Sequence, residues 1–391
     1  MTRTVKHFSL HRISAVHPFT TFRAGSERGK GIELRVIADV EEGVLPLIEA
    51  ETAVIQGYAW QEHWPHRWVT FFVLEDLQPL VRQLRLGENY SSIDSSGPSL
   101  GHPGGVGGAL PKKKYLSPED ATTLENRSVV NVYDLANLAG CNVFVNRRAM
   151  FAEGYWDDAL ALKGLLAHEH AHPLAENETV RASRWLKFEI SDFGFKNGEN
   201  GGPRFQIQNQ KSKIASLLTS LILKICLNAP RELFANEITI QSGFAEALLH
   251  LDLRNVVKAG RSVTDREGLY TQLQQEVVQG NLTPAAADLL LLVGDLSGYL
   301  DLALEVAPFY RAGRASDARA LETALETTVF PRLDALLPRA FTSLRDQYIA
   351  LRTDMTLPEL ITWGAGVLDT LTGLLSEKGL ALQYRLWMAE E

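Results

Sequence analysis

The chain is organised around the stretch Gly164-Leu165-Leu166-Ala167-His168-Glu169-His170-Ala171-His172. It contains the pattern H-E-x-x-H, with His168 and His172 at its ends and Glu169 between them. Residues four apart on a helix lie one above the other on one face, so both imidazoles can point at one metal ion. Glu169 lies beside this pair and can take a proton from a water on that metal. The pattern is typical of a zinc site with three protein ligands and a fourth position for water.

The flanking residues predict that this stretch is helical. Residues 155–167 read Y-W-D-D-A-L-A-L-K-G-L-L-A, in which Asp157 and Asp158 are suitable N-terminal caps. Pro173 follows the second histidine at once and should end the helix there. Against a metal site stands the third histidine, His170, because a histidine-rich turn can arise without any catalytic role. An apolar stripe at helical spacing supports the helix and comprises Leu160, Leu162, Leu165 and Leu166.

A third protein ligand should come from a second helix. The best candidate segment is Arg231-Glu232-Leu233-Phe234-Ala235-Asn236-Glu237, which begins just after Pro230. Proline is favourable in a first helical turn, so Glu232 would lie near a helix start. Glu237 and Glu189 are competing ligands, and a glutamate at a helix start is also favoured simply by the helix dipole.

The two motifs together resemble those of the gluzincin metallopeptidases, in which H-E-x-x-H is followed downstream by E-x-x-A-N or E-x-x-A-D. By this resemblance, Glu232 is the third zinc ligand, and Asn236 supports a ligating histidine without binding the zinc itself. The two residues are one helical turn apart and therefore share a face. The resemblance covers roughly residues 160–240, and it implies a zinc-dependent peptidase. The glycine-rich residues 196–203 between the motifs predict a loop.

The implied chemistry uses Zn²⁺ to lower the pKa of a bound water and Glu169 as the general base that accepts its proton. An alternative function is a zincin-like binding or regulatory protein in which the metal is structural and nothing is turned over. A further alternative is a helical scaffold in which the histidines bind nothing. Stabilising the oxyanion requires another donor, and no local motif selects one among His250, Arg254, Tyr270, Tyr299 and Tyr310.

The overall composition does not favour a nucleic-acid-binding protein. The 391 residues carry a formal net charge of -8, with 45% hydrophobic and 22% charged residues, which is typical of a globular protein with a substantial core. The one compact basic run is Lys112-Lys113-Lys114, which we interpret as a solvated loop. We therefore expect a peptide or protein substrate and no nucleic acid, while the sequence leaves the oligomeric state open.

Neither a membrane span nor a secretory signal is expected. Residues 214–227 are the most apolar long run, but Ser216, Thr219, Ser220 and Lys224 interrupt it, so a buried helix is the better interpretation. Residues 1–22 lack the apolar core of a signal peptide. The two cysteines, Cys141 and Cys226, do not form a C-x-x-C pair, so we expect packed thiols and a cytoplasmic location.

Changes in composition divide the chain into four segments. Residues 1–86 are rich in predicted strands, and residues 87–114 form a Gly-, Ser- and Pro-rich loop or linker. Residues 115–260 form the zincin-like catalytic unit, and residues 261–391 form an α-helical C-terminal region. We therefore predict an α+β fold that is predominantly helical, with a zincin-like metallopeptidase unit followed by a helical bundle.

Within the first three segments, apolar residues alternate or cluster as in strands at residues 31–37, 68–74, 129–133 and 141–146. A short helix is predicted at residues 77–86. In zincins the strand before the active-site helix often forms the edge along which a peptide pairs. By that resemblance, residues 142–146 are a candidate for substrate pairing, and an ordinary strand inside a sheet is the alternative.

In the C-terminal region, apolar residues recur at spacings of three and four, which predicts helices. A helix break is predicted at Gly280-Asn281-Leu282-Thr283-Pro284, with Thr283 as the cap of the next helix. No fixed period recurs, so we predict no repeat array. The predicted helical segments are residues 269–278, 284–293, 296–306, 315–337, 358–375 and 380–387.

Overall fold

The computed structural model describes residues 20–23, 31–38, 40, 43–59, 64–77, 126–135, 137–195 and 214–388. The chain forms two compact units, Met1–Leu162 and Lys163–Glu391. The chain passes from one unit to the other within helix α6 (Ala159–Ala171). The predicted helix at 77–86 beyond its first residue, the Gly-rich segment 87–114 and the predicted loop at 196–203 lie outside the described residues.

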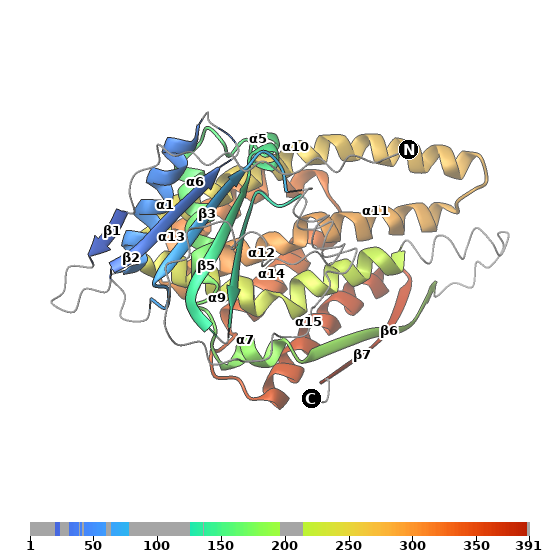
Figure 1. Cartoon of the computed structure of the whole chain (residues 1–391). Helices are drawn as coiled ribbons and strands as arrows, with labels where there is room; N and C mark the ends of the chain where they lie inside the picture. The colour runs from blue at the N-terminus through green and yellow to red at the C-terminus, as the bar shows by residue number, and fades with distance from the viewer. Residues whose placement is uncertain are drawn as a thin grey trace, which may run out of the picture. The chain divides into compact units, whose positions relative to one another are not determined.

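The first unit is built on a mixed sheet with the strand order β1-β2-β3-β5-β4 (Figure 1). The central pairs, β2 with β3 and β3 with β5, are parallel, whereas the outer pairs, β1 with β2 and β4 with β5, are antiparallel. The four predicted strands at residues 31–37, 68–74, 129–133 and 141–146 lie within β2, β3, β4 and β5. The bounds are β1 Thr20–Arg23, β2 Gly31–Ala38, β3 Trp68–Leu74, β4 Val129–Asp134 and β5 Asn137–Asn146.

The centre of this sheet is largely apolar, as in strands whose two faces are both buried. In β3, Val69, Phe71 and Val73 are completely buried, and Phe72 is nearly so. The ring of Phe72 stacks on that of Phe144 in β5, with 4.6 Å between the ring centroids. These contacts fix the register of the parallel core strands.

Strand β5 lies inside the sheet. It pairs with β3 along one edge and with β4 along the other, over most of residues 142–146. The expectation that this segment offers a free edge to a peptide substrate is therefore wrong, because its backbone groups are already used by its neighbours. The alternative, an ordinary strand inside a sheet, is confirmed.

Two helices of the first unit were not predicted from the sequence. Helix α1 (Val44–Ala59) buries Leu47, Val54, Ile55 and Tyr58, which recur at helical spacing. Its β-branched residues and Gly57 weaken its intrinsic helix propensity, so tertiary packing determines its structure. Helix α5 (Arg147–Ala152) directly follows β5 and begins at Asn146, whose side chain accepts a hydrogen bond from the Ala149 N–H at 3.1 Å.

The second unit is almost entirely helical, as predicted, which confirms the α+β and predominantly helical fold class. The predicted helix at 315–337 is in fact two helices, because a short 3₁₀ turn, η4 (Phe330–Arg332), contains Pro331 and interrupts it. The helices are α7 Glu178–Ser183, α9 Ala229–Thr239, α10 Ala245–Val278, α11 Pro284–Tyr299, α12 Ala303–Arg311, α13 Ala315–Thr328, α14 Leu336–Ile349 and α15 Leu357–Glu377, with a 3₁₀ turn η3 at Leu300–Leu302.

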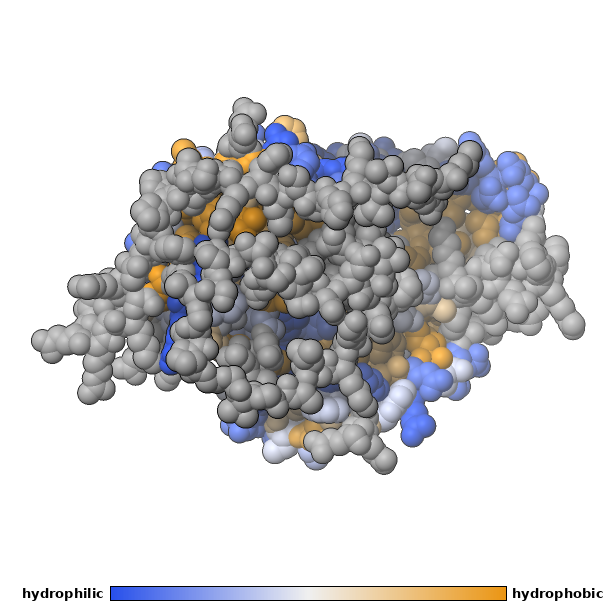
Figure 2. Space-filling view, in the orientation of Figure 1, coloured by the Kyte–Doolittle hydropathy of each residue, from blue (hydrophilic) through white to orange (hydrophobic). Residues whose placement is uncertain are grey.

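The longest helix, α10, is followed by α11 in the antiparallel direction (Figure 1). The predicted break between them is confirmed: Gly280 has a φ of 76°, and the Thr283 hydroxyl oxygen accepts a hydrogen bond from the Ala286 N–H at 3.2 Å. Hydrophilic surface covers this end of the pair in Figure 2. No single helix among the described residues is long and apolar enough to span a membrane, although one bent pair, Ile214–Leu227 with Ala229–Val278, meets that test on length and composition.

A two-stranded antiparallel ribbon completes the second unit and includes one clear correction. Strands β6 (Leu186–Phe195) and β7 (Leu380–Met388) pair with each other, and β7 packs on α15. The prediction of a helix at residues 380–387 is therefore wrong. Leu380, Leu382, Tyr384 and Leu386 alternate with more exposed residues, which is the period of a strand.

Candidate metal centre

Helix α6 carries His168 of the H-E-x-x-H pattern, and His172 directly follows its last residue. The Asp158 carboxylate caps its start by accepting a hydrogen bond from the Ala161 N–H at 3.0 Å, as predicted. The helix ends at Ala171, two residues before Pro173, also as predicted. The His168 and His172 rings lie 4.7 Å apart between centroids, nearly perpendicular to each other. Both imidazoles thus face the same side of the helix in the second unit.

The third residue comes from α9, which has an unusual local setting. Pro230 lies in its first turn, followed closely by Glu232. The helix lies between two π-helical segments, η1 (Leu223–Leu227) before it and η2 (Ile240–Phe244) after it. Such segments are rare and occur frequently at functional sites, because the extra residue changes the direction in which side chains point.

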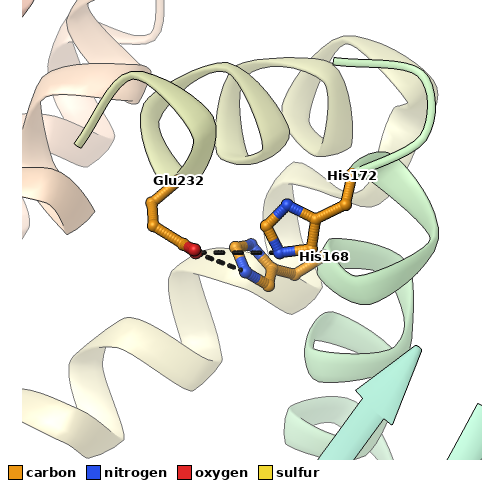
Figure 3. Close-up of side chains that lie close together, drawn as sticks. All are labelled: His168, His172 and Glu232. Atoms are coloured by element: carbon orange, nitrogen blue, oxygen red, sulfur yellow. Dashed lines mark hydrogen bonds and ion pairs between the residues drawn. The ribbon is translucent and has the colours of Figure 1, made fainter. Parts of the chain in front are cut away.

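The three side chains converge as Figure 3 shows, with the Glu232 carboxylate directed at both imidazoles. Its Oε2 atom lies 3.2 Å from His168 Nε2 and 3.7 Å from His172 Nε2. One donor atom from each residue lies within 4.8 Å of the others. Ligands of a tetrahedral zinc ion with bonds near 2.05 Å are separated by about 3.3 Å. The three donors therefore fit a metal ion of this size without large movement.

Asn236 determines which nitrogen of His168 is available for binding. The Asn236 Nδ2 amide donates to the Leu304 carbonyl at 3.2 Å, which leaves its Oδ1 as an acceptor facing His168. The His168 Nδ1–H consequently donates to that oxygen at 2.6 Å. In the neutral ring, Nε2 then presents its lone pair to the Glu232 carboxylate. Two lone-pair atoms facing each other require a cation or a proton between them, and this arrangement is what a metal site supplies.

The electrostatics of the site favour an ionised glutamate. Burial alone would raise the pKa of Glu232, but the charge of His172, the hydrogen bond and charge of His168, and the charge of Arg231 hold this pKa well below its usual range. Burial alone would lower the pKa of His168, whereas its hydrogen bond to Glu232 and the charges of Glu232 and Glu169 raise it. A carboxylate this acidic is ready to bind a cation at neutral pH.

Glu169, the predicted general base, lies on α6 directly after His168 and is only 6% exposed. It is one helical turn before His172 and therefore close to the same face. His170 is fully buried and does not belong to the group of three donors. The structure thus places His168 and His172, but not His170, in the group of three donors.

The two glutamates that competed with Glu232 as ligands do not belong to the group of three donors. The Glu237 Oε2 atom accepts a hydrogen bond from Arg311 Nε at 2.8 Å, so its charge is already compensated. Glu189 lies on β6, is exposed, and is not part of the group of donors. Sequence alone could not rank these residues against Glu232, because their separation from the histidines depends on tertiary packing.

Two of the tyrosines considered as oxyanion donors, Tyr310 and Tyr299, have other surroundings. The Tyr310 hydroxyl donates to Glu322 Oε2 at 2.6 Å, and Tyr299 lines a pocket of about 540 Å³ between α10 and α11. The structure also contains a polar pair that the sequence did not indicate, the buried carboxyl group of Asp252 on α10 and the partly buried carboxyl group of Glu305 on α12. Glu305 directly follows Leu304, the residue that accepts the hydrogen bond of Asn236.

The chain matches no protein-family model, no curated protein and no solved structure. The candidate metal site therefore depends on the geometry of His168, His172 and Glu232, and on the way Asn236 holds one of them.

Proposed function

We propose that this protein is a zinc-dependent metallopeptidase. The observation that carries the proposal is the convergence of two imidazole nitrogens and one ionised carboxylate from separate helices, with the buried Glu169 next to them. Two histidines and one glutamate are a ligand set of catalytic zinc sites, which leave one position open.

His168, His172 and Glu232 would hold the ion, the histidines through their Nε2 atoms. When bound, zinc supplies Lewis acidity, which polarises a carbonyl group and lowers the pKa of a water molecule. Asn236 keeps the His168 Nδ1–H occupied, so that Nε2 stays available as a donor. Outer residues of this kind usually change metal affinity by about 10- to 100-fold.

Glu169 is the proton carrier of the proposed reaction. Its carboxylate accepts a proton as water attacks the peptide carbonyl, and it passes that proton to the amine that leaves. Its burial limits competing hydration, and it is the neighbour of His168 in the sequence. The substrate class that this chemistry fits is a peptide or protein.

The test is the substitution Glu169→Gln, assayed against a mixed peptide library by mass spectrometry, with the zinc content measured in parallel. The expected result is a loss of hydrolysis of at least about 100-fold with zinc still bound. The variant Glu246→Gln, at an exposed position on α10, is the control and should keep full activity. If the wild-type protein binds zinc but cleaves no peptide, the metal is structural and the peptidase proposal is wrong.

A further inference from the structure

The pocket of about 540 Å³ in the second unit lies between α10, α11 and the η3 turn, where α10 and α11 run antiparallel (Figure 1). Part of its wall is apolar: Leu302 and Tyr299 are largely buried, whereas Leu269 is 40% exposed. None of the three candidate metal ligands is among the described residues that line it. The pocket is therefore a feature separate from the candidate metal centre.

Two glycines one helical turn apart on α11, Gly294 and Gly298, line this pocket. A Cβ atom added at either position would have no listed neighbour within 4 Å. Glycine inside a helix destabilises it relative to alanine, because the unfolded backbone of glycine has more freedom to lose. The helix thus leaves room at the pocket where larger residues would fit and would favour the helix.

Asp295, between these glycines, is only 4% exposed and also lines the pocket. Its Oδ1 atom accepts a hydrogen bond from Arg266 Nε at 2.7 Å, while Oδ2 is buried without a hydrogen-bond partner among the described residues. Burial raises the pKa of Asp295 although the hydrogen bond and charge of Arg266 lower it, and the charge of Asp334 raises it further. Arg266 therefore compensates this carboxylate incompletely, and a second cation would stabilise it.

The other charged groups favour a cationic ligand over an anionic one. The pocket is lined by three carboxyl groups and two basic groups, which belong to Asp265, Asp295, Asp301, Lys258 and Arg266. Lys224 pairs with Asp301 at 3.2 Å, so the carboxyl groups that remain for a ligand are those of Asp265 at the exposed rim and Asp295 inside. Ligand sites commonly combine an apolar wall with a few polar groups of this kind.

We propose that this pocket binds a primary ammonium group on a short apolar chain, with the charge near Asp295 and the chain against Leu269 and Leu302. Two sources offer this chemistry, a free alkylamine and the lysine side chain of a peptide. The proposal does not depend on the peptidase function, because binding here requires neither the metal nor Glu169.

The experiment measures binding to the full chain at pH 7 by isothermal titration calorimetry. The probes are n-hexylamine, its neutral counterpart hexanol, its anionic counterpart hexanoate, and lysine capped at both its amino and carboxyl ends. Asp295→Asn and Asp265→Asn are compared with the control Asp288→Asn, an exposed aspartate on α11 that does not line the pocket.

A second pair of variants tests the location without changing any charge. Gly298→Leu places a side chain in the pocket, and Gly373→Leu is its matched control on α15, where an added Cβ likewise has no listed neighbour within 4 Å. Thermal unfolding shows whether each variant is folded. If Asp295→Asn does not fold, the comparison of Gly298→Leu with Gly373→Leu decides.

The wild type should bind hexylamine at least about 10-fold more tightly than hexanol or hexanoate, the usual effect of a hydrogen-bonded charge. Asp295→Asn should weaken this binding by about 10-fold, and Asp265→Asn by a few-fold because it is exposed. Gly298→Leu should lose most of it, while both controls keep it. Tighter binding of capped lysine than of hexylamine identifies a peptide as the source, and the reverse order identifies a free amine.

Three results would overturn the proposal: no detectable binding of hexylamine to the wild type, equal binding of hexylamine, hexanol and hexanoate, or hexylamine binding that is unchanged in Gly298→Leu. The second result would show apolar adsorption without recognition of charge, and the third would show that the amine binds elsewhere. None of them bears on the zinc content or the hydrolysis measured for the proposed function.

Discussion

At the scale of single residues, the hydrogen bonds of Asn236 decide the state of His168. Because the amide Nδ2 donates to Leu304, its oxygen can only accept from the imidazole. The His168 Nε2 atom is then directed at Glu232 Oε2, 3.2 Å away. Without a metal ion, this contact requires an additional proton on the ring, which agrees with the raised pKa of His168.

Replacing Asn236 tests this arrangement directly. Asn236→Ala should weaken zinc binding by about 10- to 100-fold, because the imidazole loses the group that fixes its orientation. Asn236→Asp keeps an acceptor at the same place and should bind zinc within a few-fold of the wild type. Both affinities are measured by competition with a chromogenic chelator. Equal zinc affinity of the alanine variant and the wild type would show that Asn236 does not position His168.

At the scale of secondary structure, the site depends on a close approach of α6 to the start of α10. Gly164 lies one helical turn before His168, and a Cβ atom added there would lie only 2.5 Å from the Ala247 carbonyl oxygen. Since α10 follows α9 through the π-helical segment η2, this contact ties the histidine helix to the part of the chain that carries Glu232. A glycine is therefore required at this position for packing.

The corresponding prediction concerns Gly164→Ala. The methyl group should push α6 away from the backbone of Ala247, lowering the free energy of unfolding by about 1–3 kcal/mol and weakening zinc binding. Gly268→Ala, within α10 and with nothing within 4 Å of the added atom, is the matched control and should be neutral or stabilising by up to about 1 kcal/mol. Urea denaturation and chelator competition measure both effects. Indistinguishable results for the two variants would refute this role of Gly164.

The elements also show what the sequence could predict. The α6 boundaries, strands β2 and β3 and the Thr283 cap follow from local signals such as caps, proline and alternation, and these predictions are confirmed. Helix α1 was missed because its β-branched residues and Gly57 lower its helix propensity, and β7 was misassigned as a helix although its apolar residues alternate as in a strand. The approach of Glu232 to the histidines likewise depends on tertiary packing, because Glu232 lies sixty positions after His172 in the sequence. The division into four segments made from composition stays a prediction.

At the scale of the whole molecule, the second unit contains two neighbouring carboxyl groups, Asp252 and Glu305, that are poorly solvated. Burial and the charge of Glu305 raise the pKa of Asp252 well above its usual range. Burial also raises the pKa of Glu305 to about 8, although Asn255 donates a hydrogen bond to it at 3.0 Å. One oxygen of each carboxyl is buried without a hydrogen-bond partner among the described residues. Both groups therefore favour the protonated form in the folded protein.

The pair makes stability depend on pH with a defined sign. Between the ordinary carboxyl pKa near 4 and about 8, the folded state binds more protons than the unfolded state. Stability is complete below this window and falls as the pH rises through it. From pH 5 to pH 8 we expect a loss on the order of 2–4 kcal/mol, which the double substitution Asp252→Asn and Glu305→Gln should largely abolish.

Urea denaturation of the metal-free wild type and of the double variant at pH 5, 6.5 and 8 measures this effect as the difference in their free energies of unfolding, since both proteins share the same histidines. Glu246→Gln on the surface of α10 serves as the control and should behave like the wild type. A wild-type protein whose stability relative to the double variant does not fall between pH 5 and pH 8 would contradict the proposed state of the pair.

The most direct measurement of the central claim is the zinc content of the protein, purified without a histidine tag, after equilibration with zinc and removal of the excess. The wild type should retain about one zinc ion per chain, as should Glu189→Gln, which changes the competing glutamate on β6. Glu232→Gln and the double variant His168→Ala, His172→Ala should retain close to none while remaining folded. A metal-free wild type, or zinc that stays bound when all three donors are removed, would contradict the account.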